Sequence, residues 1–193
     1  VYSGIPDPYM GHGRYIGQDI LGDDMSPSER WRQWNWDVIP FILGEWTPSS
    51  SWGGNYWAYL PQRIREAYIF IENAKPLPDQ NLPLEEVEYM KAECRFLAAY
   101  YWYLLTDTYG AIPYRPNFIA PSDSDLESLK VGQIPYYQII DDLDQEFLAV
   151  SKLLPATYSD GRKYGRATSI MCLAIRARML VFSASPLVNG NPD

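Results

Sequence analysis

Apolar residues recur with helical spacing in four separate stretches of the chain. Within each stretch they lie three and four residues apart, as on one face of an α-helix. Proline, glycine and N-cap residues bound the stretches and predict helices at residues 55–74, 83–109, 134–154 and 168–184. No convincing stretch alternates apolar and polar residues with the period of a strand. The pattern therefore predicts an all-α protein.

The helix predicted at residues 83–109 carries the clearest pattern. Its residues 96–105 are apolar on every side, so we expect this helix to be central. Trp57, on the apolar stripe of the first helix, is also expected in the core. The other side chains predicted to be buried are Leu97, Tyr101, Leu104, Ile140, Leu143, Leu173 and Ala177.

The four predicted helices form two antiparallel pairs. Such a pair is the unit from which helical-repeat solenoids are stacked, so the fold is expected to be tetratricopeptide-like helical hairpins with long loops. Two pairs are fewer than the roughly three repeats that such stacks need. We therefore expect the sequence to be an incomplete chain, the N-terminal part of a longer one.

Residues 1–51 have no sustained period and are rich in turn residues. We interpret the chain, residues 1–193, as a single domain in which an irregular, aromatic-rich region, residues 1–51, packs on helices within residues 52–193. Aromatic residues make up 15% of the sequence, and the formal net charge is −8. No run of lysine or arginine is present, which argues against a nucleic-acid partner.

The sequence supplies few residues for metal or nucleophilic chemistry. Cys94 and Cys172 lie in helical stretches and are expected to be buried free thiols, and His12 is the only histidine. No metal site, cofactor or catalytic residue is therefore predicted. Asp23, Asp24 and Glu29 are better explained as a solvated acidic turn than as the acid pair of a glycoside hydrolase.

A tryptophan-rich segment at residues 30–37 is the best candidate for ligand contact. Trp31, Trp34 and Trp36 alternate with polar side chains that include Asn35. Indole rings stack on the C–H faces of sugars, while amide and charged groups bind their hydroxyls. Trp52 is a further candidate. The alternative remains that these indoles anchor the N-terminal region onto the helices.

Four segments in order resemble the SusD/RagB family of outer-membrane nutrient-binding lipoproteins of Bacteroidetes. The first is AECRFLAAYYWYLL with DTYGAIPY, residues 92–105 and 107–114. It is followed by Tyr137-x-x-Ile140-x-Asp142-Leu143, by Gly165-Arg166-Ala167-Thr168 and by Ala174-x-x-Ala177-Arg178-Met179-Leu180. Trp34-Asn35-Trp36 is similar to the Trp-x-Trp pair of the starch-binding member, although the asparagine that follows that pair there is missing here.

The resemblance implies a SusD-like fold and a binding role rather than an enzyme. It implies a cell-surface lipoprotein of the outer membrane that captures an oligosaccharide, with a peptide as second choice. The partner would be a SusC-type TonB-dependent transporter, and the membrane would be reached only through an upstream lipid anchor. Two alternatives stay open, a helical glycoside hydrolase and a tetratricopeptide-type protein scaffold.

Overall fold

The computed structural model describes residues 1–6, 28, 30, 43–45, 47, 56–121 and 125–189. The chain divides into two compact units, one of Val1–Ser3 with Leu60–Asp193 and one of Gly4–Tyr59. Most described residues belong to the first unit, which contains nearly all of the helical structure.

The described elements are all helices. In chain order they are η1 (Tyr2–Gly4), α3 (Tyr56–Asn73), η4 (Pro78–Gln80), α4 (Leu84–Tyr109), α5 (Leu126–Leu129), α6 (Tyr136–Ser151), η5 (Gly161–Lys163), α7 (Ser169–Ser183) and α8 (Pro186–Asn189). The described part of the chain contains no β-strand, only isolated bridges. The all-α prediction is confirmed.

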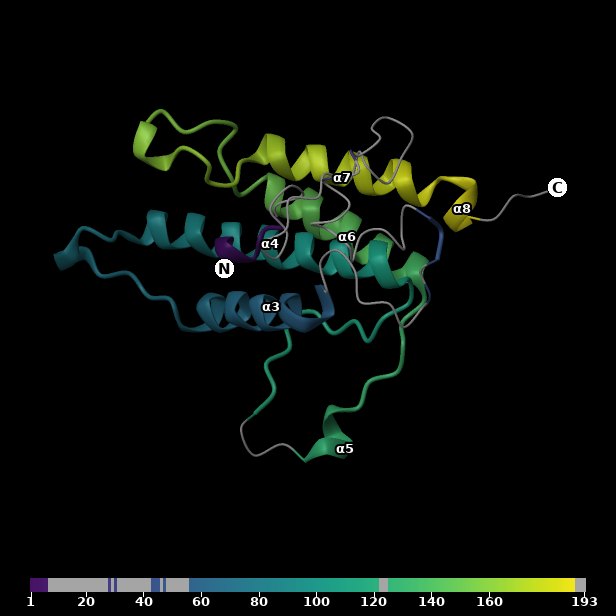
Figure 1. Cartoon of the computed structure of the whole chain (residues 1–193). Coiled ribbons are helices and arrows are strands. Elements are labelled where there is room, and N and C mark those ends of the chain that lie inside the picture. Colours follow the sequence, from purple (N-terminus) through teal and green to yellow (C-terminus); the bar gives the residue numbers. More distant parts are fainter. Residues whose placement is uncertain are drawn as a thin grey trace. The chain divides into compact units, whose positions relative to one another are not determined.

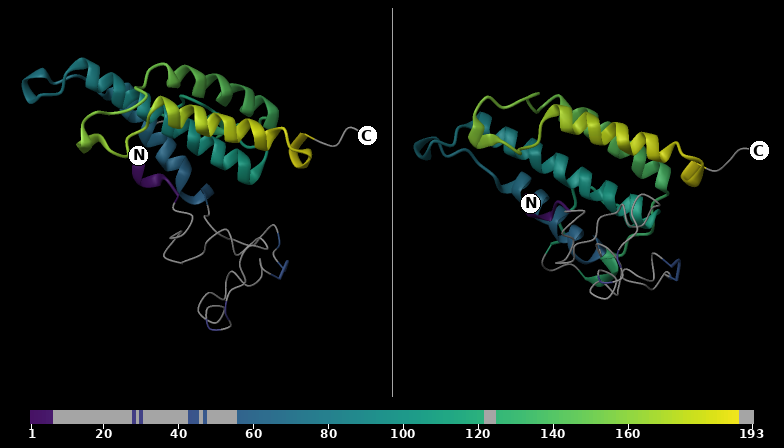
Figure 2. Two further views of the ribbon diagram at one scale, coloured as in Figure 1. Left: turned by 90° about the horizontal axis from the view of Figure 1, so that it is seen from above. Right: turned by 45° about the horizontal axis from the view of Figure 1, so that its top comes forward.

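The four long helices, α3, α4, α6 and α7, lie within three residues of their predicted ends. Consecutive long helices run in opposite directions, so the predicted hairpins are present (Figure 1). From above, α6 and α7 lie side by side along α4 (Figure 2). None of the described helices is both long enough and apolar enough to cross a membrane.

Local sequence signals lie at the boundaries of three of the long helices. Gly110 adopts a positive φ of 73°, and its N–H donates to the Thr106 carbonyl at the end of α4. The Thr168 side chain accepts a hydrogen bond from the backbone N–H of Met171 and caps α7. Pro135 is the N-cap of α6.

α4 is the centre of the core. Leu97, Tyr101 and Leu105 are completely buried, and Phe147 of α6 packs edge-on against Phe96 at a ring distance of 6.1 Å. The prediction is also confirmed for Ile140 and Leu143 of α6. A buried aromatic and aliphatic cluster therefore joins α4 to α6.

The predicted burial of α7 is wrong. Leu173 is 44% exposed and Ala177 is also exposed, whereas Cys172 and Met179 are completely buried. Cys172 lies one residue from Leu173, about 100° around a helix of 3.6 residues per turn, and Met179 lies two residues from Ala177, about 200°. The cause is that α7 is apolar on almost every side, so the pattern did not identify which face meets α6.

Two smaller predictions are also corrected. Leu104 is only partly buried, and Trp57 is 46% exposed. Both cysteines are buried and free, as predicted. Burial raises the pKa of Cys94 to about 11 and that of Cys172 to about 12, so neither thiol is reactive at neutral pH.

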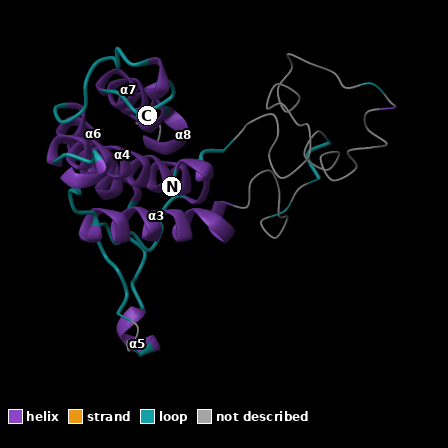
Figure 3. Cartoon of the chain, turned by 90° about the vertical axis from the view of Figure 1, so that its left-hand side faces the viewer, coloured by secondary structure: helices purple, strands orange, loops and turns teal. Residues whose placement is uncertain are grey.

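The connection between α4 and α6 leaves the bundle and returns to it. α5 lies at its far end, away from the long helices (Figure 3). Where the connection leaves and rejoins the bundle, the Ile134 N–H donates to the Ile112 carbonyl at 2.9 Å. This hydrogen bond joins the two ends of the connection. This contact holds residues 112–118 near the start of α6.

Candidate functional site

The site predicted from the sequence lies outside the described residues. Trp31, Trp34, Asn35, Trp36 and Trp52 all belong to segments that the structure does not describe. Their assignment as ligand-binding residues stays a prediction, and so does the alternative that they are anchors. The carboxylates Asp23, Asp24 and Glu29 are likewise outside the described part.

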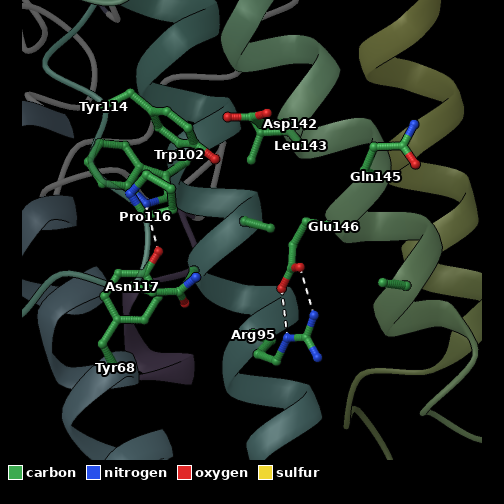
Figure 4. Close-up of a pocket in the computed structure, with 13 residues that line it drawn as sticks. Tyr68, Arg95, Trp102, Tyr114, Pro116, Asn117, Asp142, Leu143, Gln145 and Glu146 are labelled. Carbon is green, nitrogen blue, oxygen red and sulfur yellow. Dashed lines mark hydrogen bonds and ion pairs between the residues drawn. The ribbon is translucent and has the colours of Figure 1, made fainter.

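Within the described residues, a groove lies between α6 and the segment at residues 112–118. One cavity of about 300 Å³ is backed by α3 and α4, and a second of about 430 Å³ shares Tyr114, Pro116 and Asp142 with it. We call these two adjoining cavities the α6 groove. Its aromatic and polar residues in the first cavity are Tyr68, Arg95, Trp102, Tyr114, Asn117, Asp142, Gln145 and Glu146 (Figure 4).

An ion pair closes one end of the first cavity. Arg95 of α4 binds Glu146 of α6 through two hydrogen bonds, Nε to Oε1 and Nη2 to Oε2, each 2.7 Å long. Each side chain is 33% exposed. The bonds to Glu146 raise the pKa of Arg95, although burial opposes the shift. Because both Glu146 oxygens are occupied, this carboxylate acts as a fixed wall rather than as a free acid.

Aromatic side chains form the opposite wall. The Trp102 indole N–H donates to the Tyr68 hydroxyl at 3.0 Å, and Trp102 meets Tyr114 edge-to-face at a ring distance of 5.1 Å. All three rings are more than nine-tenths buried. They therefore offer ring edges to the groove rather than a broad stacking surface.

Tyr114 has a free hydroxyl. The side chain is only 8% exposed, and its oxygen forms no hydrogen bond with any described residue. In the close-up the hydroxyl points away from the wall toward α6 (Figure 4). Burial, and next the negative charge of Asp142, raise the pKa of Tyr114 above its ordinary value. At neutral pH the group is therefore an uncharged donor and acceptor.

α6 presents a polar row to the groove. Gln138, Asp141, Asp142 and Gln145 lie on one exposed face, with the i, i+3 and i+4 spacing of helical neighbours. Asp141, Asp142 and Gln145 form no hydrogen bond or ion pair within the described part of the chain. This arrangement suits the binding of a hydroxylated ligand. No cluster of three metal-binding side chains occurs among the described residues.

A second ion-pair cluster fastens the connection between α6 and α7 to α4. Glu93 of α4 is 4% exposed and accepts hydrogen bonds from Tyr2 at 2.9 Å, Tyr158 at 3.1 Å and Arg166 at 2.7 Å. The Tyr2 hydroxyl in turn accepts the Ala167 N–H at 2.8 Å. Glu93 and Arg166 belong to segments that carry the family resemblance, and their role here is structural.

Glu86 extends this cluster toward solvent. It accepts from Lys163 at 2.6 Å and also binds Arg166. These two cations lower the pKa of Glu86. Burial opposes the charged form of Arg166, but the hydrogen bonds of Arg166 to Glu93 and Glu86 outweigh it and raise the pKa of Arg166. Glu86 and Arg166 therefore stay ionised at neutral pH.

Sequence reasoning did not single out the α6 groove. Tyr114 and Asp142 lie in segments that carry the family resemblance, but the resemblance assigns no role to them. The usable signal was the polar face of α6, where Gln138, Asp142 and Gln145 recur at helical spacing opposite the buried stripe. That the segment at residues 112–118 covers this face could not be predicted from the spacing.

Comparisons with known proteins identify the family. Residues 8–181 match the SusD-like family described as "Starch-binding associating with outer membrane". No curated protein matches the chain significantly.

Among solved structures, the protein named BT4246 is 34% identical, with a TM-score of 0.59 over 68% of this chain and 21% of its own. Surface glycan-binding protein A from Bacteroides uniformis is 19% identical, with a TM-score of 0.70 over 94% of this chain and 40% of its own. A SusD-like protein from Bacteroides fragilis, BF3747, is 18% identical, with a TM-score of 0.71 over 94% of this chain and 33% of its own. The last two likenesses show the fold.

The chain spans between 21% and 40% of the length of these three proteins. The match over residues 8–181 includes the tryptophan-rich segment, the α6 groove and, apart from Tyr2, the cluster around Glu93. The chain belongs to the SusD-like family that carries this description.

Proposed function

We propose that this chain is part of a cell-surface protein that captures an oligosaccharide and passes it to a SusC-type TonB-dependent transporter. The observation that carries the proposal is the family match over residues 8–181. A related structure is named a surface glycan-binding protein, and another is named a SusD-like carbohydrate-binding protein. A peptide ligand is the second choice.

The proposed ligand contacts are Trp31, Trp34, Asn35, Trp36 and Trp52. Three indoles within six residues, separated by polar side chains, supply both stacking surfaces and hydrogen-bonding groups. We call residues 31–36 the tryptophan segment. The proposed role is binding, with affinity from stacking and hydroxyl contacts.

Calorimetry with a panel of polysaccharides tests the proposal. Trp34→Ala and Trp36→Ala should each weaken glycan binding by about 2 kcal/mol or more, close to thirtyfold, with little change in melting temperature. Trp57→Ala is the matched control, since Trp57 is a partly exposed indole outside the tryptophan segment. It should leave affinity unchanged.

The opposite result would identify the indoles as anchors. A fall in stability of about 3 kcal/mol or more, with affinity affected only through unfolding, is the expected cost of truncating a buried tryptophan. Failure of the full-length protein to bind any glycan in the panel would contradict glycan capture and favour a peptide ligand or a scaffold role. Release of reducing ends from a bound polysaccharide would favour a hydrolase.

The transporter and the location need their own experiment. Affinity purification from solubilised outer membranes should recover a TonB-dependent transporter together with the full-length protein. Protease treatment of intact cells should degrade the protein, as expected for a protein on the cell surface. Recovery without any transporter, or protection from the protease, would contradict this part of the proposal.

A further inference from the structure

We infer that the α6 groove is a second glycan site, which binds neutral sugar units and is built entirely from residues of the helical unit. The inference rests on the proposed function, because it assumes that the protein meets oligosaccharides. It adds a location and a ligand class that do not depend on the tryptophan segment. Three features of the groove support it.

The first feature is the Tyr114 hydroxyl. Its ring is almost completely buried, yet the oxygen has no hydrogen-bond partner among the described residues and faces α6 across the groove (Figure 4). The oxygen itself is not fully enclosed, because Tyr114 lines both cavities, so it is open to the groove and available to a ligand. A sugar hydroxyl can both donate to and accept from this oxygen.

The second feature is the row of amides and carboxylates along α6. From Gln138 to Glu146 the row spans about 12 Å at 1.5 Å per residue. Asp142 and Gln145 face the first cavity, and Gln138 and Asp141 face the second. Carboxylates accept hydrogen bonds from sugar hydroxyls, and amides both donate and accept. The two joined cavities can therefore hold adjacent units of one oligosaccharide.

The third feature is the charge of the groove. Among the described residues that line the two cavities, Arg95 is the only cation, and Glu146 neutralises it through two hydrogen bonds. Asp141 and Asp142 remain without a partner in the described structure. The groove is therefore negative, and it repels uronate or sulfate groups. This selects neutral glycans over acidic ones.

The walls are held in place before any ligand arrives. Arg95–Glu146 joins α4 to α6, and Trp102–Tyr68 joins α4 to α3. The contact between Ile134 and Ile112 fixes the base of the segment that carries Tyr114. A rigid groove lowers the ordering cost of binding.

Two small substitutions test the site in the full-length protein. Tyr114→Phe removes only the hydroxyl, and Gln145→Ala removes an exposed amide. Each should weaken binding of a neutral oligosaccharide, measured by calorimetry with maltoheptaose, xylohexaose and mannohexaose, by about threefold to tenfold. Tyr164→Phe and Gln80→Ala are matched controls at exposed positions outside the groove and should leave affinity unchanged.

Hydrogen exchange locates the site independently of affinity. A bound neutral oligosaccharide should slow exchange of backbone amides at residues 112–118 of the wild-type protein. Tyr114→Phe should reduce this protection. An oligogalacturonate of similar length should neither bind the groove nor protect this segment.

The outcomes separate the groove from the tryptophan segment. If Trp34→Ala and Trp36→Ala weaken binding while Tyr114→Phe and Gln145→Ala do not, the groove is not a glycan site and the proposed function stands. If the groove variants weaken binding while the tryptophan variants do not, the groove site stands and the tryptophan assignment is wrong. Tight binding of oligogalacturonate that depends on Gln145 would overturn the neutral class. Absence of binding to every neutral oligosaccharide would overturn the groove site altogether.

Discussion

α4 and α7 are both strongly apolar helices, but the fold uses them in opposite ways. α4 is surrounded by α3, α6, α7 and the first residues of the chain, and half of its side chains are buried. In α7 only Cys172 and Met179 are buried, while Leu173 and Val181 are 44% and 75% exposed. Apolar content alone therefore does not identify a core helix.

The polar contacts of the two helices show what does distinguish them. α4 carries Glu93 and Arg95, two residues apart, and each forms ion pairs with a different neighbour. α7 forms one ion pair, from Arg176 to Asp144 of α6 at 2.7 Å, on the side that meets α6. Charged side chains within an apolar helix thus mark the directions in which its partners lie.

The largest expected effect comes from a cavity-forming substitution in the central helix, α4. Leu97→Ala should lower the free energy of unfolding by about 2–5 kcal/mol, because Leu97 is completely buried and its truncation leaves a cavity. Chemical denaturation followed by circular dichroism measures the change. A loss below about 1 kcal/mol would show that α4 is not the centre of the core.

The next largest effect is expected when the buried charge of Glu93, within α4, is removed. Glu93→Gln should cost about 1.5–3 kcal/mol, since the carboxylate accepts charge-assisted bonds from Arg166 and its loss leaves that guanidinium partly unpaired. Thermal melts compare it with Glu88→Gln, a control in which the exposed carboxylate binds Lys91 at 3.4 Å. Equal losses in the two variants would contradict a special role for the Glu93 cluster.

The sequence predicted those parts of the fold where apolar and polar positions contrast clearly. The four long helices, the cap at Thr168, the end at Gly110 and the buried thiols follow from local signals. The orientation of α7 did not, because its apolar residues do not favour one side. The α6 groove depends on how residues 112–118 return to α6, a long-range contact that local spacing does not contain.

The candidate ligand contacts show the same limit of prediction from sequence. Stacking chemistry can be inferred from the composition of residues 31–36, yet whether an indole binds a ligand or anchors a loop depends on its exposure. Exposure is a property of the fold, not of the segment. Tyr114 and Asp142 illustrate this, because neither residue type is unusual until the fold brings both to one groove.

The pH dependence of stability tests how much the charge of Glu86 in α4 contributes to the fold. Hydrogen bonds from Lys163 and then Arg166 hold its pKa below the ordinary value of 4.5. The resulting stability is fully present above pH 4.5 and is lost as the pH falls through the lowered pKa of the folded state. Glu86→Gln should therefore cost about 1 kcal/mol at pH 7 and nothing at the acid end.

Denaturant melts of wild type and Glu86→Gln between pH 2 and 7 measure this difference. Glu72→Gln, at an exposed residue of α3, is the control and should show no such pH-dependent loss. A difference between wild type and Glu86→Gln that stays constant across this range would show that the ion pairs do not stabilise the fold through the charge of Glu86.

The smallest expected effect tests the exposed side of α7. Leu173→Ala and Val181→Ala in the 193-residue chain should each change the free energy of unfolding by less than about 0.5 kcal/mol, because exposed side chains lose little on truncation. Met179→Ala, on the buried side of the same helix, should cost about 2–5 kcal/mol and provides the matched comparison. All three changes shorten an apolar side chain in one helix, so differences in helix propensity stay small beside a cavity term. A loss of 2 kcal/mol or more at Leu173 or Val181 would mean that this side of α7 is covered by another polypeptide segment, and α7 would then resemble α4 after all.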